Sequence, residues 1–595
     1  MRSCNDIMRG RIRFQALLIV LFFAYLIGKL YCEQIRRHDY YYTEARNKYV
    51  TSKKLKGVRG EIFDMHGNLL AGNMPCQNVS VTPCNIKAKD DEKISRLIAE
   101  TLGLDYEYVL KRVSLKTRTV KDESGKVLTL PLKYALIANN IHLEDARYLR
   151  QVLKKHSLAR NVHFEDTFTR YYPKGTFLSN VVGITTRNQG SNRGEMGLEK
   201  RFEKQLRSDS GKKTYMRSLD GWQVGDKPLQ EVSSHDGSNI FLTVVEPLQS
   251  ILEDELDKAW EKFRPRAAYA VMIDPATGNV LAIAERPSFD PNDRKSLDNS
   301  AFKIRLISDI MEPGSIMKPL TVAGALECKA ITPDTVIDCG NGTWYYNNRP
   351  LTDTHGYGRQ DVTGVIRKSS NIGIAKIGLM MGEQNLYNSL RKFGFGSRTG
   401  LPLSPESSGI FHPVKRWDGQ TITRLGIGYA SACTPVQMAR AYCALANNGR
   451  LPKLRLIDRT VDTESGKVTV MPPAEMQQIY PPEVIQQVVK MMIAVTEPGG
   501  TATRAAIPGY HVAGKTGTSH KVANGGYVGK YFASFVGFVP AEKPAFVLLV
   551  TVDEPKGAKF GGTVSAPVWK AMAERALKYM NIPPDVPQDE SKKRH

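Results

Sequence analysis

The apolar run from Phe14 to Cys32 is the feature that most constrains how this chain can fold. It is interrupted only by Gln15 and Lys29. At about 1.5 Å per residue, a helix of this length just spans the roughly 30 Å of hydrocarbon in a bilayer. Lys29 lies near one end of the run and can extend to the interface. We therefore expect residues 14–32 to form a transmembrane anchor that follows a short tail, residues 1–13.

A cleaved signal peptide is the alternative explanation of this run, and it requires small residues at the cleavage site. Tyr31 precedes Cys32, and no A-x-A stretch follows, so a retained anchor is favoured. Basic residues lie both before the run and within or after it, and therefore decide little about orientation: Arg2, Arg9, Arg11, Arg13, Lys29, Arg36, Arg37, Arg46 and Lys48. No second apolar run of comparable length occurs, so we expect a single-pass protein.

The formal net charge of +23 over 595 residues raises the possibility of nucleic-acid binding. The charge is spread along the chain, however, and we find no zinc-finger spacing and no aromatic RNA-binding motif. A solvated basic surface next to an anionic membrane or wall polymer is the better interpretation. None of the cysteines forms a C-x-x-C pair, while Cys76 and Cys84 could either bridge in an oxidising compartment or stay free.

Two regions follow the predicted anchor. Residues 33–238 are rich in charged and turn residues, contain helical periodicity at 91–113 and 143–156, and assemble no nucleophile with a base. We expect them to be a positioning or docking module. Residues 239–580 predict a sheet covered by helices, with a mostly helical centre at 315–500. Their expected strands are 239–245, 268–274, 279–284, 512–518, 531–539 and 545–552, and their flanking helices are 247–263 and 566–580. The fold class is therefore α+β, and the polar tail 581–595 is expected to be disordered.

The first of three chemical motifs is Ser315-Ile-Met-Lys318, which follows Pro313 and Gly314 and leads into a helical run. Ser315 would lie at the start of the helix, with Lys318 one turn later on the same face. A serine hydroxyl is a weak nucleophile without an adjacent base. A neutral Lys318 amine can be that base, so Ser315 is the predicted nucleophile.

The second motif is Ser369-Ser370-Asn371. In a non-helical turn, Ser369 and Asn371 can project toward the same cleft. The hydroxyl of Ser369 can relay a proton to a leaving amine, and the amide of Asn371 can hold Lys318 or a substrate carbonyl.

The third motif is Lys515-Thr516-Gly517-Thr518, in a strand-like run. We expect Lys515 and Gly517 to face one way, and Thr516 and Thr518 the other. Gly517 would let a substrate backbone approach closely, and the N–H groups of Thr518 and Ser315 would form an oxyanion hole. Lys515 would attract a substrate carboxylate and keep Lys318 deprotonated by like-charge repulsion.

Each motif alone occurs often by chance, and a capping serine beside a solvated lysine is the ordinary meaning of S-x-x-K. The set S-x-x-K, S-x-N and K-T-G in this order is shared by penicillin-binding proteins and class A β-lactamases. The chain resembles the class B penicillin-binding proteins over nearly its whole length, and within them the cell-division, FtsI-type transpeptidases (penicillin-binding protein 3). The resemblance is carried by these motifs together with Arg59-Gly60, residues 170–173 (RYYP), 194–199 (GEMGLE), 405–409 (PESSG), 426–429 (GIGY) and 525–527 (GGY).

This resemblance implies a membrane helix, an elongated mixed pedestal domain for dimerisation or partner docking at 33–238, and a transpeptidase domain with a central antiparallel sheet at 239–580. It implies that Ser315 attacks the D-Ala-D-Ala bond of a peptidoglycan stem peptide outside the cytoplasm, and that an amine of a neighbouring strand resolves the acyl-enzyme. No metal or organic cofactor is implied. β-Lactams would acylate the same serine, while a membrane-embedded glycosyltransferase and other division proteins at the septum would be partners.

Four alternatives remain open from the sequence. An elongation-specific class B transpeptidase would share every motif. A β-lactamase would need neither an anchor nor a preceding module. A β-lactam-sensing receptor would carry several membrane spans and an H-E-x-x-H protease, which this sequence lacks. A scaffold with a degenerate site is disfavoured by the intact motifs.

Overall fold

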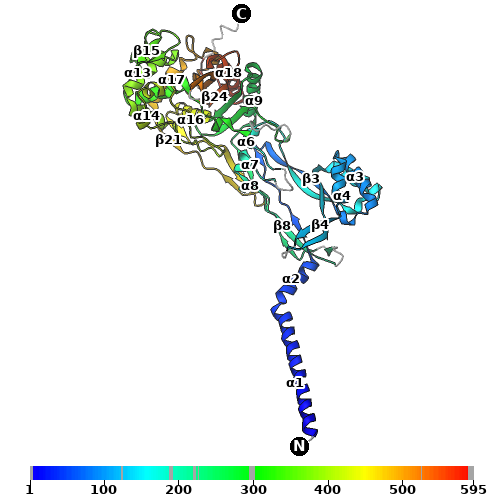
Figure 1. Cartoon of the computed structure of the whole chain (residues 1–595). Helices are drawn as coiled ribbons and strands as arrows, with labels where there is room; N and C mark the ends of the chain where they lie inside the picture. Colours follow the sequence, from blue (N-terminus) through cyan, green and yellow to red (C-terminus); the bar gives the residue numbers. More distant parts are fainter. Residues whose placement is uncertain are drawn as a thin grey trace. The chain divides into compact units, whose positions relative to one another are not determined.

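The computed structural model describes residues 4–121, 125–186, 192–218, 223–225, 227–293, 302–523 and 526–586. It divides into two units, one made of residues 1–58 with 208–236 and the other of residues 59–207 with 237–595 (Figure 1). Each unit is described by itself.

The first unit contains the apolar helix α1 (Cys4–Tyr31), a π-helical turn (Cys32–Arg36) and α2 (His38–Tyr49). Strand β1 (Val50–Leu55) pairs antiparallel with β8 (Gly211–Arg217), which also pairs with β9 (Gln223–Val224) and β10 (Gln230–Val232). Leu17, Leu21 and Phe22 of α1 are each more than half exposed. Among the residues that the structure describes, one stretch, Met8–Arg36, is long and apolar enough to cross a bilayer. This helix fits the predicted single-pass anchor.

In the second unit, a small lobe has its own core. Helices α3 (Ala88–Leu102), α4 (Tyr106–Ser114) and α5 (Leu143–Lys155) pack on β3 (Leu69–Val81), β6 (Ala135–His142) and β7 (Val162–Tyr171). The helical periodicity at 91–113 belongs to two helices, because Gly103 ends α3 at a φ of +62°. Asp105 caps α4 by accepting from the Tyr108 N–H. An exposed hairpin, β4 (Thr117–Lys121) and β5 (Val127–Pro131), follows α4.

A seven-stranded sheet joins segments that lie far apart in the sequence. Its order is β20-β19-β11-β2-β3-β6, and β7 also pairs with β3. Strand β11 (Asn239–Leu242) pairs parallel with β2 (Ile62–Phe63) and antiparallel with β19 (Ile457–Val461), which pairs with β20 (Val468–Val470). The strand expected at 239–245 therefore lies in this sheet. Residues from both sides of the sequence boundary at 238 build it together.

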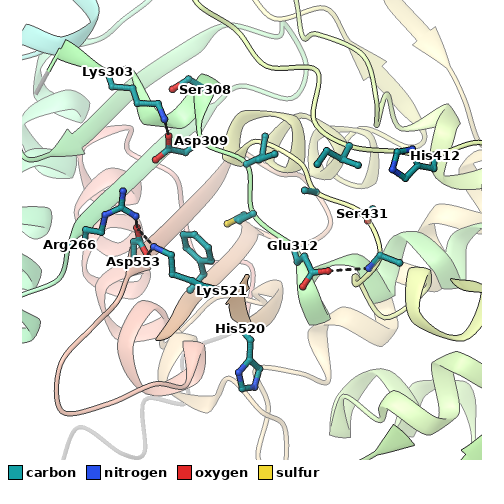
Figure 2. Close-up of a pocket in the computed structure, with 16 residues that line it drawn as sticks. Arg266, Lys303, Ser308, Asp309, Glu312, His412, Ser431, His520, Lys521 and Asp553 are labelled. Atoms are coloured by element: carbon teal, nitrogen blue, oxygen red, sulfur yellow. Dashed lines mark hydrogen bonds and ion pairs between the residues drawn. The ribbon is translucent and has the colours of Figure 1, made fainter. Parts of the chain in front are cut away.

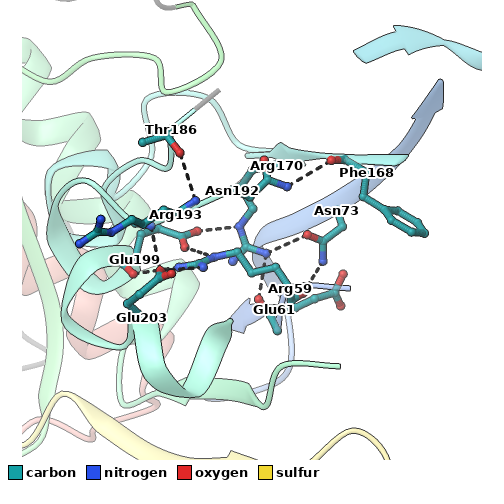
Figure 3. A network of polar contacts seen from close by, with 12 residues as sticks. Arg59, Glu61, Asn73, Phe168, Arg170, Thr186, Asn192, Arg193, Glu199 and Glu203 are labelled. Atoms are coloured by element: carbon teal, nitrogen blue, oxygen red, sulfur yellow. Dashed lines mark hydrogen bonds and ion pairs between the residues drawn. The ribbon is translucent and has the colours of Figure 1, made fainter. Parts of the chain in front are cut away.

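A buried network of charges supports this part of the second unit (Figure 3). Glu199 is fully buried and accepts hydrogen bonds from Arg59 Nε at 2.7 Å and Arg170 Nε at 2.6 Å. The second carboxylate, Glu203, accepts from Arg59 Nη1 at 2.8 Å. Glu199 lies in α7 (Gly197–Arg201) and Glu203 in α8 (Glu203–Leu206), both after α6 (Ser179–Val182). The network ties these short helices to the segment before β2 and to β7.

The central sheet is antiparallel and has the order β13-β12-β24-β23-β22. It contains the predicted hairpin β12 (Ala267–Ile273) and β13 (Val280–Arg286), together with β22 (Ala513–Ala523), β23 (Gly526–Val539) and β24 (Phe546–Asp553). Helices α9 (Glu246–Phe263) and α18 (Gly561–Tyr579) pack against each other and on this sheet, while α16 (Pro435–Ala446) packs on β24 and β12 (Figure 1). The predicted α+β fold with a helix-covered antiparallel sheet is confirmed.

The centre of the chain is helical, as predicted, but short strands interrupt it. Its helices are α10 (Arg305–Ser308), α11 (Lys318–Glu327), α12 (Val362–Lys368), α13 (Asn371–Met381), α14 (Glu383–Lys392), α15 (Thr421–Leu425), α16 and α17 (Pro482–Ile493). Its strand pairs are β14 (Ile337–Asp338) with β17 (Arg359–Gln360), β15 (Thr343–Tyr346) with β16 (Arg349–Thr352), and β18 (Arg450–Pro452) with β21 (Met476–Gln478). Such short strands are too brief to give a sequence periodicity.

Two further expectations concern the cysteines and the tail. Cys76 and Cys84 are not bridged to each other in the structure, and Cys76 Sγ lies 3.6 Å from Asn140 Oδ1. Of the tail, residues 587–595 lie outside the described residues. Asp585 is described, and it accepts a hydrogen bond from the His511 N–H at 2.9 Å.

Candidate active site

Ser315 lies in a 3-10 turn, Gly314–Met317, directly before α11. Pro319 falls in the first turn of α11, where its missing N–H has no helical partner to lose. Gly314 has a φ of +56° and donates its N–H to the Gly428 carbonyl at 2.9 Å, which fixes the turn against a second loop. Ser315 lines a cavity of about 510 Å³. Ser369, Asn371, Thr516 and Thr518 line the same cavity, so residues from all three motifs meet there.

Lys318 is fully buried behind this cavity. Its Nζ donates to Ser369 O at 2.6 Å, to Asn371 Oδ1 at 2.8 Å and to Ser369 Oγ at 3.2 Å. Burial lowers the pKa of Lys318 to about 7, because desolvation disfavours the charged amine, while the charge of Asp353 opposes the shift. A large share of this amine is therefore neutral near pH 7, as a general base requires.

The second motif forms the break between two helices. Ser369 ends α12 with a φ of +59°, and Ser370 is the N-cap of α13, accepting from the Gly373 N–H at 2.9 Å. Asn371 is the first residue of α13. The non-helical geometry is what lets Ser369 and Asn371, two residues apart, both reach Lys318.

Asp353, which no sequence motif marks, holds this break in place. Its carboxylate accepts from Ser370 Oγ at 2.5 Å, from the Ile372 N–H at 3.3 Å and from the Asn371 N–H. The preceding residue, Thr352, accepts from Asn371 Nδ2 at 2.8 Å through its carbonyl. Asp353 is therefore a positioning residue, and it also places a negative charge near Lys318. A long-range contact of this kind has no signal in the local sequence.

The third motif lies on β22, which ends the central sheet and pairs with β23 on one side. Thr516 and Thr518 face the cavity, while Lys515 is fully buried and donates to Thr516 O at 3.2 Å. A Cβ on Gly517 would lie 3.0 Å from Ile316 Cγ2 and 3.3 Å from the Pro313 carbonyl oxygen. The glycine therefore makes room for the loop that carries the nucleophile, a packing role in addition to the expected approach of a substrate backbone.

The two buried lysines are electrostatically coupled. Burial lowers the pKa of Lys515 well below its usual value, and the positive charge of Lys318 lowers it further. For Lys318, burial is the largest cause of the lowered pKa. Lys368, Arg504 and Lys559, which the sequence analysis did not single out, place further positive charge on the cavity wall.

Comparison with known proteins identifies two family domains in this chain. Residues 268–574 match the penicillin binding protein transpeptidase domain, and residues 54–242 match the penicillin-binding protein dimerisation domain. The peptidoglycan D,D-transpeptidase FtsI of Escherichia coli K12 is 29% identical, with 95% of this chain and 91% of that protein aligned. Stage V sporulation protein D of Bacillus subtilis 168 is 30% identical, with 100% of this chain and 89% of that protein aligned.

Among solved structures, penicillin-binding protein 3 of Mycobacterium tuberculosis complexed with aztreonam is similar, with a TM-score of 0.67 and 25% identity. The match covers 90% of this chain and all of that one. The transpeptidase match alone spans more than half of the sequence, and a dimerisation match precedes it. The family predicted from the three motifs is therefore confirmed, and the chain belongs to the class B penicillin-binding proteins.

Proposed function

We propose that this protein is a peptidoglycan D,D-transpeptidase that works through an acyl-enzyme on Ser315. The observation that carries the proposal is the buried amine of Lys318, bonded to Ser369 and Asn371 beside the serine. The transpeptidase family match and the names of the relatives support the same reaction. Lys318 takes the proton of Ser315 Oγ as that oxygen attacks the carbonyl of the D-Ala-D-Ala bond. Ser369 passes the proton to the departing D-alanine amine.

The remaining motif residues bind and stabilise in this proposal. The N–H groups of Ser315 and Thr518 receive the oxyanion, and Asn371 holds the lysine. The strand of the third motif, with Lys515, Thr516 and Gly517, forms one side of the site. The cations on the cavity wall, Arg504 and Lys559, attract the terminal carboxylate of the stem peptide. β-Lactams, which resemble the D-Ala-D-Ala end, acylate the same serine.

Labelled penicillin tests the proposal directly. Mass spectrometry of the treated full-length protein in detergent should show one adduct, on the peptide that contains Ser315. Ser315→Ala should remove it, whereas Ser465→Ala, at an exposed serine, should not. An adduct on any other residue would overturn the assignment. Release of the adduct over minutes or longer fits a transpeptidase, while rapid turnover would identify a β-lactamase and exclude a cross-linking enzyme.

For the cellular role, we infer septal wall synthesis during division, with the catalytic domain outside the cytoplasm and α1 as its anchor. FtsI-type relatives support this inference, and a membrane-embedded glycosyltransferase with other division proteins would be the partners. The alternatives are a role in elongation or one like that of the sporulation relative. Depletion should give filaments if the role is septal. Rounded cells would indicate elongation, and a defect confined to spores would indicate sporulation.

A further inference from the structure

The wall of the cavity that contains Ser315 carries an excess of positive charge. Among the described residues that line it, Lys368, Arg504 and Lys559 are cations, and none is an aspartate or a glutamate. None of the three belongs to an ion pair within the described part of the chain. Asp353, which holds the turn of the second motif, does not line the cavity. A ligand in this cavity therefore meets three cations and no fixed negative charge.

A neighbouring cavity shows how charges are balanced elsewhere in this domain (Figure 2). It has a volume of about 550 Å³, and His520 lines both cavities. Its described wall also has three lysine and arginine side chains, but these stand beside three carboxylates. The ion pairs are Lys303 with Asp309, and Arg266 and Lys521 with Asp553. The positive excess is thus a property of the cavity of Ser315 and not of its neighbour.

Two of the three cations lie beside the third motif. Arg504 belongs to the 3-10 turn Thr503–Ala505, which packs on α18, and Lys559 comes shortly before that helix. Thr501 Oγ1 lies 3.1 Å from Thr516 Oγ1, so the segment that leads to Arg504 contacts β22. In the proposed reaction these two cations attract the terminal carboxylate of the donor peptide. That carboxylate supplies one negative charge, which leaves the third cation without a counterpart.

The third cation, Lys368, comes from a different element, the last turn of α12, directly before Ser369. Its Nζ donates to the Gly499 carbonyl at 3.1 Å. This carbonyl is neutral, and an ammonium group has three N–H donors, so the charge and further donors of Lys368 are available to a ligand. A basic residue in this turn also stabilises the helix end through the helix dipole. Arg367 lies in the same turn and donates to the Pro498 carbonyl, but it does not line the cavity.

We propose that the donor stem peptide carries a second anionic group besides its terminal carboxylate, and that Lys368 binds this group. The inference rests on the proposed transpeptidase function and deepens it, because it assigns the class of donor. That donor has a free carboxylate on a residue before the D-Ala-D-Ala end, where a carboxamide would be a poor substitute. A hydrogen bond between an ammonium group and a carboxylate is roughly twice as strong as one between neutral groups. A carboxamide keeps the size of the group and loses its charge.

The test compares two donor peptides that differ only in these groups. Each ends in a D-alanyl thioglycolate, which keeps a terminal carboxylate and releases a thiol when Ser315 is acylated. The first has a free carboxylate on each of the two residues before the D-alanine, and the second has carboxamides there. Thiol release by the full-length protein in detergent gives kcat/KM for each donor. We expect the wild-type protein to prefer the acidic donor at least tenfold, and Lys368→Gln to reduce this preference to threefold or less.

Two variants separate binding by Lys368 from a structural role. Lys368→Arg keeps the charge and should keep the preference. Arg367→Gln removes a cation from the same helix end and the same loop contact, and its preference should stay within twofold of wild type. Labelled penicillin acylation of each variant shows that its site is folded. Added salt should shrink the wild-type preference, because it screens a partly exposed ion pair.

The outcomes distinguish this inference from the function on which it rests. If Lys368→Gln slows both donors equally, the lysine only holds the loop at Gly499, and the second anionic site is refuted. Equal kcat/KM values for the two donors with the wild-type protein would refute it as well. If the wild-type protein releases no more thiol from either donor than Ser315→Ala does, the proposed transpeptidase function fails instead.

Discussion

At the residue scale, the chemistry of the site depends on how one buried amine is solvated. Lys318 exchanges water for the Ser369 and Asn371 oxygens, and burial lowers its pKa to about 7. A lysine with an ordinary pKa would be almost wholly charged at pH 7 and could not accept the proton of Ser315. The rate of acylation should therefore be high above this pKa and fall as the pH drops through about 7.

Asp353 gives this pH dependence a specific test. Its negative charge raises the pKa of Lys318 against the effect of burial. Asp353→Asn removes that charge, so the pKa of Lys318 should fall further, and the acid limb of the acylation profile should move to lower pH. The maximum rate should also fall, because an amide replaces the carboxylate that holds Ser370 and Asn371. The measurement is the rate of acylation by a chromogenic β-lactam from pH 5 to 9.

The matched control is Asp361→Asn. Asp361 caps α12 by accepting from the Gly364 N–H at 2.7 Å, and it does not contribute to the pKa shift of Lys318. This variant should leave the acid limb where it is. If Asp353→Asn lowers the rate with an unmoved limb, Asp353 only positions Ser370 and Asn371, and its electrostatic role is refuted.

Local spacing explains which site residues the sequence could indicate. Ser315 and Lys318 are one helical turn apart, and Ser369 and Asn371 flank a break, so short motifs place them. Asp353 gains its role from a chain segment 17 residues away. Contacts over that distance follow from tertiary packing, and a single sequence carries no local sign of them.

At the element scale, strong apolar periodicity predicted the central sheet and the helices that cover it. The ends of helices and the contacts between loops depend on backbone geometry, which periodicity does not predict. The hairpin of β12 and β13 and the helices α9 and α18 follow from long apolar patterns. Gly103 split one predicted helical region into two, because its left-handed conformation ends α3. The apolar pattern of the sequence also does not predict where two loops approach each other closely.

Gly428 is such an approach, and it supports a prediction. It has a φ of +87°, and a Cβ there would lie 2.1 Å from the Gly314 carbonyl oxygen. Gly428→Ala must push apart the two loops that carry Tyr429 and Ser315. We expect penicillin acylation to slow by about 100-fold, because a displacement near 1 Å at a reacting group has effects of that order.

Gly400→Ala is the matched control for Gly428→Ala. Gly400 has a similar φ of +84°, but a Cβ there would meet nothing within 4 Å. It carries the same backbone strain, of about 1–3 kcal/mol, without the clash. Its acylation rate, measured on the folded protein, should stay within a few-fold of wild type. Equal losses in both variants would mean that strain alone, and not the position of the loop, explains the effect.

At the scale of the whole molecule, the second unit is held together by pairings that cross the sequence boundary between the two predicted regions. Strand β2 lies next to β11, and β11 lies next to β19, so one sheet includes residues near 62, 240 and 459. The sequence predicted the strand near 240 but not the one near 459, which lies in the region expected to be mostly helical. It could not predict their neighbours, because strand order depends on tertiary packing and not on local propensity.

The Glu199 network also joins distant segments of the second unit, here through buried charges. Its loss should increase local unfolding of the strands that it contacts. Glu199→Gln leaves the buried guanidinium groups of Arg59 and Arg170 without their shared carboxylate, and unpairing a buried charge costs about 3–5 kcal/mol. Glu203→Gln, at a side chain 24% exposed that pairs with Arg59 alone, should cost less.

Hydrogen exchange read by mass spectrometry measures this opening in β3 and β7. We expect at least about 100-fold faster exchange in Glu199→Gln, as 1.4 kcal/mol corresponds to roughly a tenfold change. Equal exchange in the two variants would show that Arg59 and Arg170 remain solvated or paired without Glu199, and that the sheet alone holds these segments together.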